Sequence, residues 1–297
     1  MKQENYREES GDVMIHFSKV YKQGSNPANE DAYVENQEKG LFAVIDGATG
    51  LGGLPGKMAA ETIQNGFYTG NFEDSLIERI SKGNTDLAKK TKQELGQEIE
   101  VIAKEKRSAC GIAAIQMHEN YMEYAQSGDC MIFVAYQDGG VQPLSYDHVM
   151  RLDQKAISKL YDAIAKRMEQ QISGETFQKI YQEEKEHIIP ELKANRKKLN
   201  TLGGYSIIDG SPEAVEYLTY GRIPLHQVEK ILLITDGMQL HGVNGDVWKE
   251  TANFVFQYGI DSLLDFVVEQ EEADIFLQKY PRLKHADDKT GILVERS

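Results

Sequence analysis

One stretch of the chain joins a buried strand to a charged end. Residues 41–45 are five apolar residues, and Asp46 and Gly47 follow them directly. A continuous apolar run of this length predicts a β-strand that is buried on both faces. The carboxylate then lies where the core meets solvent, and burying it without a compensating charge would be costly. The nearest downstream base in the sequence is Lys57, so a metal cation is one way to compensate Asp46, and Gly47 would let a backbone carbonyl approach it closely.

The same design occurs again far along the chain. Residues 231–234 are apolar, and a threonine, Asp236 and a glycine follow them. An isolated Asp-Gly pair is usually a turn whose carboxylate accepts hydrogen bonds from the backbone. We interpret Asp138 and Asp209 in that way, because they follow no comparable apolar run. If both apolar strands are central, however, Asp46 and Asp236 can reach one rim of one core.

Other carboxylates flank predicted strands, namely Glu30, Asp31, Asp129, Asp287 and Asp288. Several carboxylates at one rim would repel one another and raise each other's pKa unless a cation lies among them. Ligand sets made only of oxygen, without His or Cys, favour hard ions such as Mg²⁺, Mn²⁺ or Ca²⁺. The sequence therefore allows a carboxylate metal site at the rim.

The composition argues against some partners. The chain has 297 residues, of which 40% are hydrophobic, and a formal net charge of -14. This charge disfavours nucleic acid or an anionic membrane surface, because both attract basic proteins. It suits a cation site, although an acidic surface commonly serves solubility alone. The two cysteines are too few and too far apart for a zinc motif, and we interpret them as buried thiols in a reducing compartment.

No targeting or membrane segment is expected. Residues 1–10 lack the apolar core of a signal peptide. No apolar run approaches the roughly 18 residues that a membrane span needs. The sequence therefore predicts a cytoplasmic protein without membrane insertion.

Periodicity predicts a mixed α+β chain. Strands are expected at residues 12–18, 32–34, 41–45, 109–117, 121–126, 131–136, 141–144 and 230–234, with a closing strand after 288. Helices are expected at 55–67, 72–106 with a break near Gly83, 246–258 and 261–279, with a further helix start at 211–213. The short turns between 109 and 136 favour an antiparallel meander. Residues 149–199 are helical and charged and predict a helical hairpin.

Five sequence blocks, taken in order, resemble the motifs of one family. They are residues 29–31 (Asn-Glu-Asp), 42–47 (Phe-Ala-Val-Ile-Asp-Gly), 127–129 (Ser-Gly-Asp), 232–237 (Leu-Leu-Ile-Thr-Asp-Gly) and 287–290 (Asp-Asp-Lys-Thr). The set is similar to the PP2C (PPM) family of metal-dependent protein serine/threonine phosphatases, in its bacterial type. The resemblance runs from about residue 12 to the C-terminus and leaves out residues 149–199.

The resemblance implies the fold and the activity of that family. The fold is a four-layer α-β-β-α sandwich, in which two antiparallel sheets are flanked by helix pairs. Residues 1–297 would form one such domain, with residues 149–199 as a helical insertion. The implied activity is hydrolysis of phosphoserine and phosphothreonine in a phosphoprotein substrate, by a water activated between two Mn²⁺ or Mg²⁺ ions. No covalent phosphoenzyme is implied.

The resemblance also implies a role for particular residues. Asp46 would bridge the two ions and, with Asp236 and Asp287, would be catalytic. Glu30 and the Gly47 carbonyl would hold one ion, and Asp236 and Asp287 the other. A third, weaker ion would be held with the help of Asp129. We assign the ligand position to Asp287 rather than Asp288, because the family has Asp-Asn or Asp-Asp before its Thr strand.

Two positions depart from better-known members. A phosphate-binding Arg usually lies five residues before the Asp of the Glu-Asp pair, where this chain has Asn26. The histidine that follows Asp-Gly in many eukaryotic members is Ala48 here, and bacterial members commonly lack it too. Candidate substitutes are Arg107 and Lys57 for phosphate binding, and His148 and His241 for acid–base work, although a lone histidine is usually a structural residue.

Two other functions are compatible with the sequence. The chain could be a catalytically weak member that uses the fold to bind a partner, or a hydrolase of small phosphate esters. The hairpin of residues 149–199 is interpreted as a cover that selects substrates or binds a partner, with a solvated appendage as the alternative.

Overall fold

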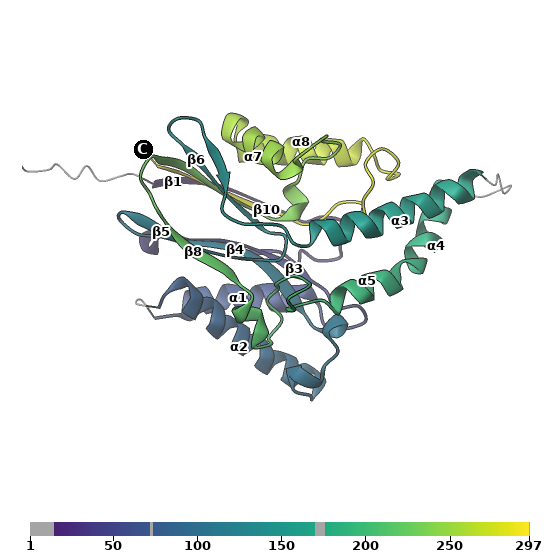
Figure 1. Cartoon of the computed structure of the whole chain (residues 1–297), viewed down its shortest axis with the longest axis horizontal. Helices are drawn as coiled ribbons and strands as arrows, with labels where there is room; N and C mark the ends of the chain where they lie inside the picture. Colours follow the sequence, from purple (N-terminus) through teal and green to yellow (C-terminus); the bar gives the residue numbers. More distant parts are fainter. Residues whose placement is uncertain (1–14, 72–73, 170–175, 297) are drawn as a thin grey trace, which may run out of the picture.

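The computed structural model describes residues 15–71, 74–169 and 176–296, and it contains two antiparallel sheets that face each other (Figure 1). The first, called the β10 sheet, has the order β1 (Ile15–Lys22), β10 (Lys289–Arg296), β9 (Val228–Ile234), β6 (Met131–Tyr136) and β7 (Val141–Pro143). The second, called the β3 sheet, has the order β2 (Ala32–Asn36), β3 (Leu41–Ala48), β4 (Ala109–Met117), β5 (Tyr121–Ser127) and β8 (Thr219–Pro224). Residues 12–14 of the predicted first strand lie outside the described residues.

Helix pairs cover the outer face of each sheet. α1 (Gly56–Thr69) and α2 (Leu76–Leu95) lie against the β3 sheet, and α7 (Val247–Tyr258) and α8 (Ile260–Glu272) lie against the β10 sheet (Figure 1). The layer order is therefore helix, sheet, sheet, helix. This arrangement confirms the predicted α-β-β-α sandwich.

The apolar run of β3 is buried on both faces, as predicted. Phe42 and Val44 face the gap between the sheets and belong to a cluster with Ile132 and Leu233. Ala43 and Ile45 point the other way, into the cluster formed with α1 and α2. Because successive side chains of a strand alternate between its faces, Asp46 lies on the side of Phe42 and Val44, at the rim between the two sheets.

α2 is continuous through the predicted break at Gly83. The helix starts with a capping box between Ser75 and Glu78 and ends at Gly96, which has a left-handed φ of 67°. Gly83 is buried against α1, and a Cβ at this position would lie 3.0 Å from Ile63 Cδ1. The glycine therefore permits close helix packing instead of breaking the helix. Residues 97–106 contain only the short 3-10 helices η2 (Ile99–Val101) and η3 (Lys104–Lys106).

The predicted meander is wrong in its last strand. β4 and β5 pair antiparallel, but β6 pairs with β9 in the other sheet. The turn at residues 128–130 thus carries the chain from one sheet to the other. The sequence pattern cannot distinguish the two pairings, because β6 is apolar on both faces: Ile132 and Val134 face the β3 sheet, whereas Met131 and Phe133 face α7 and α8.

Two further segments differ from the prediction. A short helix α6 (Glu213–Glu216) begins near the predicted start, and the sequence pattern does not predict β8, which follows it. α8 ends at Glu272 rather than near 279. Downstream, the Asp274 carboxylate accepts hydrogen bonds from the backbone N–H groups of Gln278 (2.8 Å) and Tyr280 (2.8 Å) and pairs with Arg282 at 2.8 Å. These bonds hold the chain after α8 in an irregular loop.

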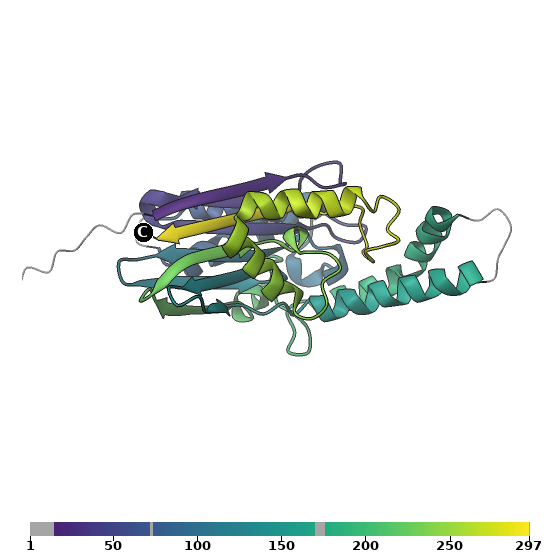
Figure 2. The same cartoon turned by 90° about the horizontal axis from the view of Figure 1, so that it is seen from above.

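The predicted hairpin extends from the body, as Figure 2 shows. It consists of α3 (Met150–Glu169), α4 (Phe177–His187) and α5 (Ile189–Arg196), with Pro190 at the start of α5. Its own small core contains Leu160, Ile164, Ile180 and Tyr181, and Leu277 from the loop after α8 packs against it. This loop therefore joins the base of the hairpin to the body.

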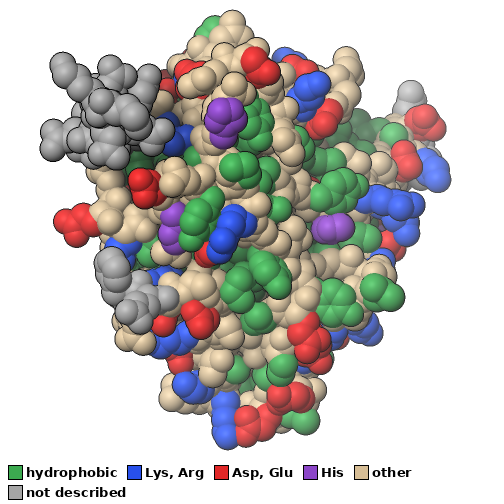
Figure 3. Space-filling view, turned by 60° about the vertical axis from the view of Figure 1, so that its left-hand side comes forward, with side chains coloured by type: hydrophobic (Ala, Val, Ile, Leu, Met, Phe, Trp, Pro, Cys, Tyr) green, Lys and Arg blue, Asp and Glu red, His purple; other side chains and the backbone are tan. Residues whose placement is uncertain are grey.

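One face of the molecule carries both acidic and basic side chains (Figure 3). On the face shown in Figure 3, acidic and basic side chains are interspersed rather than gathered by sign. Among the helices of the described residues, none has both the length and the apolar character that crossing a bilayer requires. A concentration of acidic side chains is found instead inside a cavity at one end of the sandwich.

Candidate metal centre

The ends of several strands meet at one edge of the sandwich. In the β3 sheet, Ala32 lies opposite Ile45, so the residues before β2 adjoin the end of β3. In the β10 sheet, Ile234 lies opposite both Met131 and Gly291. The residues that precede β6 and β10 therefore adjoin those that follow β9. These are the segments that carry the predicted ligands.

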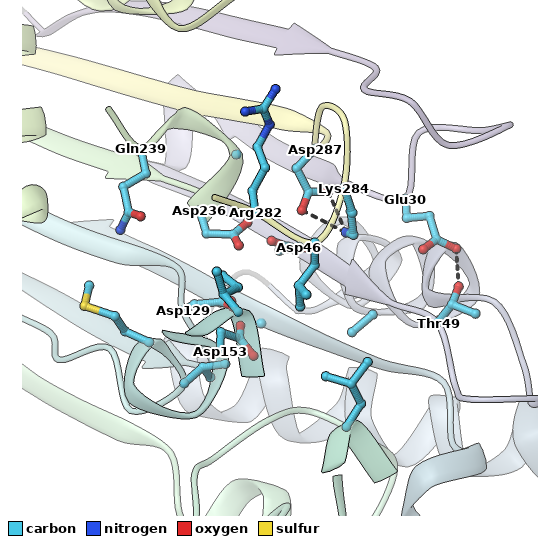
Figure 4. Close-up of a pocket in the computed structure, with 18 of the residues that line it drawn as sticks. Glu30, Asp46, Thr49, Asp129, Asp153, Asp236, Gln239, Arg282, Lys284 and Asp287 are labelled. Atoms are coloured by element: carbon cyan, nitrogen blue, oxygen red, sulfur yellow. Dashed lines mark hydrogen bonds and ion pairs between the residues drawn. The ribbon is translucent and has the colours of Figure 1, made fainter. Parts of the chain in front are cut away.

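A cavity of about 800 Å³ opens at this edge. All six predicted ligand residues line it, namely Glu30, Asp46, Gly47, Asp129, Asp236 and Asp287. Figure 4 shows the carboxylates of Asp46, Asp236 and Asp287 gathered together, with Glu30 to one side. Asp46 belongs to β3, and Asp236 opens the short 3-10 helix η4 (Asp236–Met238) after β9. Residues from distant parts of the sequence thus share one cavity.

Burial and mutual repulsion make these carboxylates reluctant to ionise. Desolvation raises the pKa of Asp46 well above its ordinary value, and the charges of Asp31 and Asp236 add to the rise. Desolvation also raises the pKa of Asp129, with a further contribution from Asp236. Desolvation followed by the charge of Asp287 raises the pKa of Asp236 to about 6. A cation placed among them would relieve this repulsion.

Lys284 supplies one positive charge at this place. Its Nζ lies 2.7 and 2.8 Å from the two carboxylate oxygens of Asp287. Although desolvation lowers the pKa of Lys284, the charges of Asp287, Asp236 and Asp46 raise it overall. The ammonium group therefore compensates part of the negative charge of the cavity.

The donor set fits a hard divalent cation. The Asp236 Oδ1 atom is buried and has no hydrogen-bond partner among the described residues, which is costly unless another ligand satisfies it. Among the residues that the structure describes, no three Asp, Glu, His or Cys side chains lie close enough together to form a complete metal site. Asp287 is engaged by Lys284, and Glu30 Oε1 accepts hydrogen bonds from the Thr49 hydroxyl and from Gly56 N at 3.1 Å. The unsatisfied Asp236 oxygen and the oxygen-only donor set are what fit a hard divalent cation.

Two aspartates whose structural role the sequence reasoning missed tie the strand ends together. The buried Asp31 Oδ2 accepts hydrogen bonds from the hydroxyls of Thr290 (2.6 Å) and Thr235 (3.1 Å). Asp288 accepts from Gly24 N at 2.7 Å and from Glu30 N at 2.8 Å. Asp31 follows the predicted ligand Glu30 in the sequence, and Asp288 follows the predicted ligand Asp287. This adjacency is the one feature of the sequence that could have indicated their role.

The Gly47 position is tightly enclosed. A Cβ there would lie 2.2 Å from the carbonyl oxygen of Glu30, which is backbone and cannot rotate away. Gly47→Ala is therefore expected to lower the free energy of unfolding by about 1–3 kcal/mol, measured by chemical denaturation. Gly203→Ala is the matched control, because a Cβ at Gly203 meets nothing within 4 Å. Equal stability of the two variants would contradict the close approach.

The hairpin also contributes side chains to the cavity, and these residues were not predicted from the sequence. α3 supplies Asp153 and α5 supplies Asn195 and Arg196. Desolvation, followed by the charges of Asp236 and Asp147, raises the pKa of Asp153 to about 7, although Arg196 and Lys284 oppose the rise. Figure 4 places Asp153 near Asp129 and Asp236. The insertion therefore reaches the candidate site.

The structure separates the other candidate residues into those that line the cavity and those that do not. Asn26 and His241 line the cavity, whereas Lys57, Arg107 and His148 do not. Arg107 is committed to a buried ion pair with Asp209 at 2.9 Å, and Lys57 lies 3.7 Å from Glu61 on the surface of α1. Asp138 Oδ1 accepts a hydrogen bond from Gly140 N at 2.9 Å, which confirms its assignment to a turn. Asp209 Oδ1 likewise accepts from Ser211 N at 3.0 Å.

Comparison with known proteins identifies one family. The family model described as protein phosphatase 2C matches residues 21–279. No curated protein sequence gives a significant match.

Solved phosphatases share the fold. The PstP catalytic domain, solved in complex with two manganese ions, is 14% identical, with 96% of this chain and 99% of that chain covered and a TM-score of 0.57. The Mycobacterium tuberculosis phosphatase PstP/Ppp is 16% identical, with coverages of 95% and 98% and a TM-score of 0.56. Stp1 from Staphylococcus aureus is 15% identical, with coverages of 96% and 95% and a TM-score of 0.53. At such low identities these structures support the fold alone, but the family model spans most of the sequence, and the chain therefore belongs to the protein phosphatase 2C family.

Proposed function

We propose that the protein is a metal-dependent phosphatase that hydrolyses phosphoserine and phosphothreonine in proteins. The observation that carries this proposal is the convergence of the predicted carboxylates on one cavity, where Asp236 Oδ1 is buried without a partner among the described residues. The family membership supports a reaction on phosphate esters. The PstP structure with two manganese ions supports the choice of cofactor.

The proposed ligands are those that the sequence predicts. Asp46 would bridge two Mn²⁺ or Mg²⁺ ions, with Glu30 and the Gly47 carbonyl on one and Asp236 and Asp287 on the other. Asp129 would help to hold a third. When bound, such ions supply Lewis acidity that neutralises phosphoryl charge and makes water acidic enough to act as a nucleophile near neutral pH.

The chain's own residues would position these groups and the substrate. Asp31 and Asp288 fix the strand ends that carry the ligands. The hairpin of residues 149–199 would cover the site and select substrates, because Asp153 of α3 and Arg196 of α5 line the cavity. These lining residues bring the hairpin to the edge of the cavity, and this supports the role of a cover over that of a solvated appendage.

The purified protein is expected to hydrolyse p-nitrophenyl phosphate and a phosphothreonine peptide in the presence of Mn²⁺. Activity should disappear on chelation with EDTA and return with added Mn²⁺. The buried carboxylates alone carry no positive charge that could neutralise the phosphoryl oxygens, and a metal ion would supply it as a Lewis acid. Release of inorganic phosphate is the measurement. Hydrolysis that survives complete chelation would contradict the proposal.

A catalytically weak member that binds a partner is the second candidate. The specific observation in its favour is the uncharged Asn26 at the cavity wall, where the family resemblance leads one to expect an arginine. Calorimetry with Mn²⁺ separates the two: two bound ions without phosphate release would favour the binding module. A preference for small esters over phosphopeptides in a substrate panel would instead favour a small-molecule phosphatase.

A further inference from the structure

Four cationic side chains line the cavity, and they differ in how many of their hydrogen-bond donors are already used. Lys185, Arg196, Arg282 and Lys284 are the cationic side chains that line it. Lys185 Nζ donates to the carbonyl of Leu283 at 2.6 Å. Arg282 is held by the Asp274 carboxylate, and Lys284 by both oxygens of Asp287. Arg282 and Lys284 are thus paired with carboxylates, and Lys185 uses one of its three donors on a backbone carbonyl.

Arg196 differs from the other three. Its Nη1 atom is buried and has no hydrogen-bond partner among the described residues. Its Nη2 atom makes one long hydrogen bond, 3.4 Å, to the carbonyl oxygen of Thr49. The neighbouring Asn195 also has a buried Nδ2 atom that lacks an acceptor in the described structure. Two adjacent residues at the end of α5 therefore present unsatisfied donors at the cavity.

The position of Arg196 relates these donors to the candidate metal centre. Thr49 lies in the loop that follows Asp46, and its hydroxyl donates to the Glu30 carboxylate. Thr49 therefore links the guanidinium group of Arg196 to one proposed ligand, Glu30. Asn26, which also lines the cavity, carries no charge.

Physical chemistry selects the class of ligand that would satisfy these donors. Burying a donor without an acceptor costs free energy, and a guanidinium group forms its strongest hydrogen bonds with carboxylate or phosphate oxygens. Asp153 attracts Arg196, since the arginine lowers the pKa of that carboxyl group. No ion pair joins the two side chains in the described structure, however, so the Nη1 donor stays open to a ligand.

We infer that Arg196, assisted by Asn195, binds the phosphoryl group of the substrate. The inference rests on the proposed function, and it makes the inserted hairpin a source of phosphate recognition. The donors lie at the C-terminal end of α5, where Arg196 already contacts the carbonyl of Thr49 in the loop after β3.

The test compares Arg196→Gln and Arg196→Lys with Arg151→Gln. Arg151 is an exposed arginine on α3 that does not line the cavity. Its replacement by glutamine therefore removes the same charge from the same insertion without changing the cavity. Two readouts are used for each protein in Mg²⁺: calorimetric titration with inorganic phosphate, and kcat and KM for a phosphothreonine peptide. Calorimetry with Mn²⁺ checks that the metal sites are unchanged.

Arg196→Gln is expected to weaken phosphate binding and raise KM by about 10-fold or more, as loss of a charge-assisted hydrogen bond implies. Arg196→Lys should recover part of the loss, because it restores charge without the planar fork. Arg151→Gln should match the wild type, and Mn²⁺ binding should be the same in all four proteins.

Three outcomes would overturn the inference. They are wild-type phosphate affinity in Arg196→Gln, a loss confined to kcat with unchanged phosphate affinity, and no phosphate binding by the wild-type protein. If the wild type binds phosphate through Arg196 but hydrolyses nothing, the proposed function fails and the anion site stands. The two ideas are thereby distinguishable.

Discussion

Asp46→Asn is expected to lower kcat by about 100-fold to 1,000-fold, as removal of one group that stabilises a transition state typically does. Asp46 is the proposed bridge between two cations, and it lies among Asp31, Asp129, Asp236 and Asp287, whose charges all act on it. An amide keeps the shape of the side chain but cannot neutralise two metal charges. The measurements are Mn²⁺-dependent release of phosphate and the number of Mn²⁺ ions bound.

Asp138→Asn is the matched control for this loss. Asp138 also belongs to an Asp-Gly pair, but it is exposed in a turn away from the cavity. It should keep wild-type activity and metal binding. The folded state of metal-free Asp46→Asn should be no less stable than that of the wild type, because the substitution removes a buried charge that its neighbours repel. Wild-type turnover in Asp46→Asn would contradict the proposed metal centre.

The strand-Asp-Gly pattern predicted the centre of the fold because two physical demands coincide there. Residues 41–45 and 231–234 are apolar at every position, which only a central strand can bury. A carboxylate at the end of such a strand must lie at the rim of the core. The helix pairs and their sheets followed from periodicity and from the family resemblance together.

Pairing between strands could not be predicted in the same way. β6 is apolar on both faces, so its pattern fits either sheet, and a short turn does not determine which sheet it joins. Gly83 was predicted to break a helix, yet it serves the contact between α1 and α2. β8 is an edge strand whose burial alternates, and its sequence, Thr-Tyr-Gly-Arg-Ile-Pro, contains both glycine and proline. The pairing of β6, the packing at Gly83 and the formation of β8 all depend on residues that are distant in the sequence.

The same limit applies to the site. The predicted carboxylates lie at or beside the ends of strands, so the local pattern reveals them. Asp153 and Arg196 lie on helices of the insertion, where charged residues normally face solvent. Only the packing of α3 and α5 over the end of the sandwich brings them to the cavity. The motifs thus revealed the proposed metal ligands but not the side chains that the hairpin adds to the cavity.

Metal-free protein is expected to lose stability as pH rises from about 5 to 7.5. The folded-state pKa values of Asp236 (about 6) and Asp153 (about 7) exceed the ordinary value of 3.8. Between 3.8 and these values, the folded protein therefore binds more protons than the unfolded chain. Its stability must fall with rising pH, by up to about 1.4 kcal/mol per pH unit for each group, until the pH passes the folded-state pKa. Thermal denaturation in EDTA across this range is the measurement.

Mn²⁺ should reverse this loss, because a cation that binds only the folded state compensates the carboxylates once they ionise. At 100 times its dissociation constant, each independent site adds about 2.7 kcal/mol, so the gain in melting temperature should be largest above pH 7. Asp236→Asn should flatten the pH dependence in EDTA and reduce the response to Mn²⁺. Asp261→Asn, an exposed substitution on α8, should leave both unchanged. If metal-free protein instead gained stability toward pH 7.5, the carboxylates of the cavity would have to be ionised and satisfied without a cation, and the reason for placing one there would be lost.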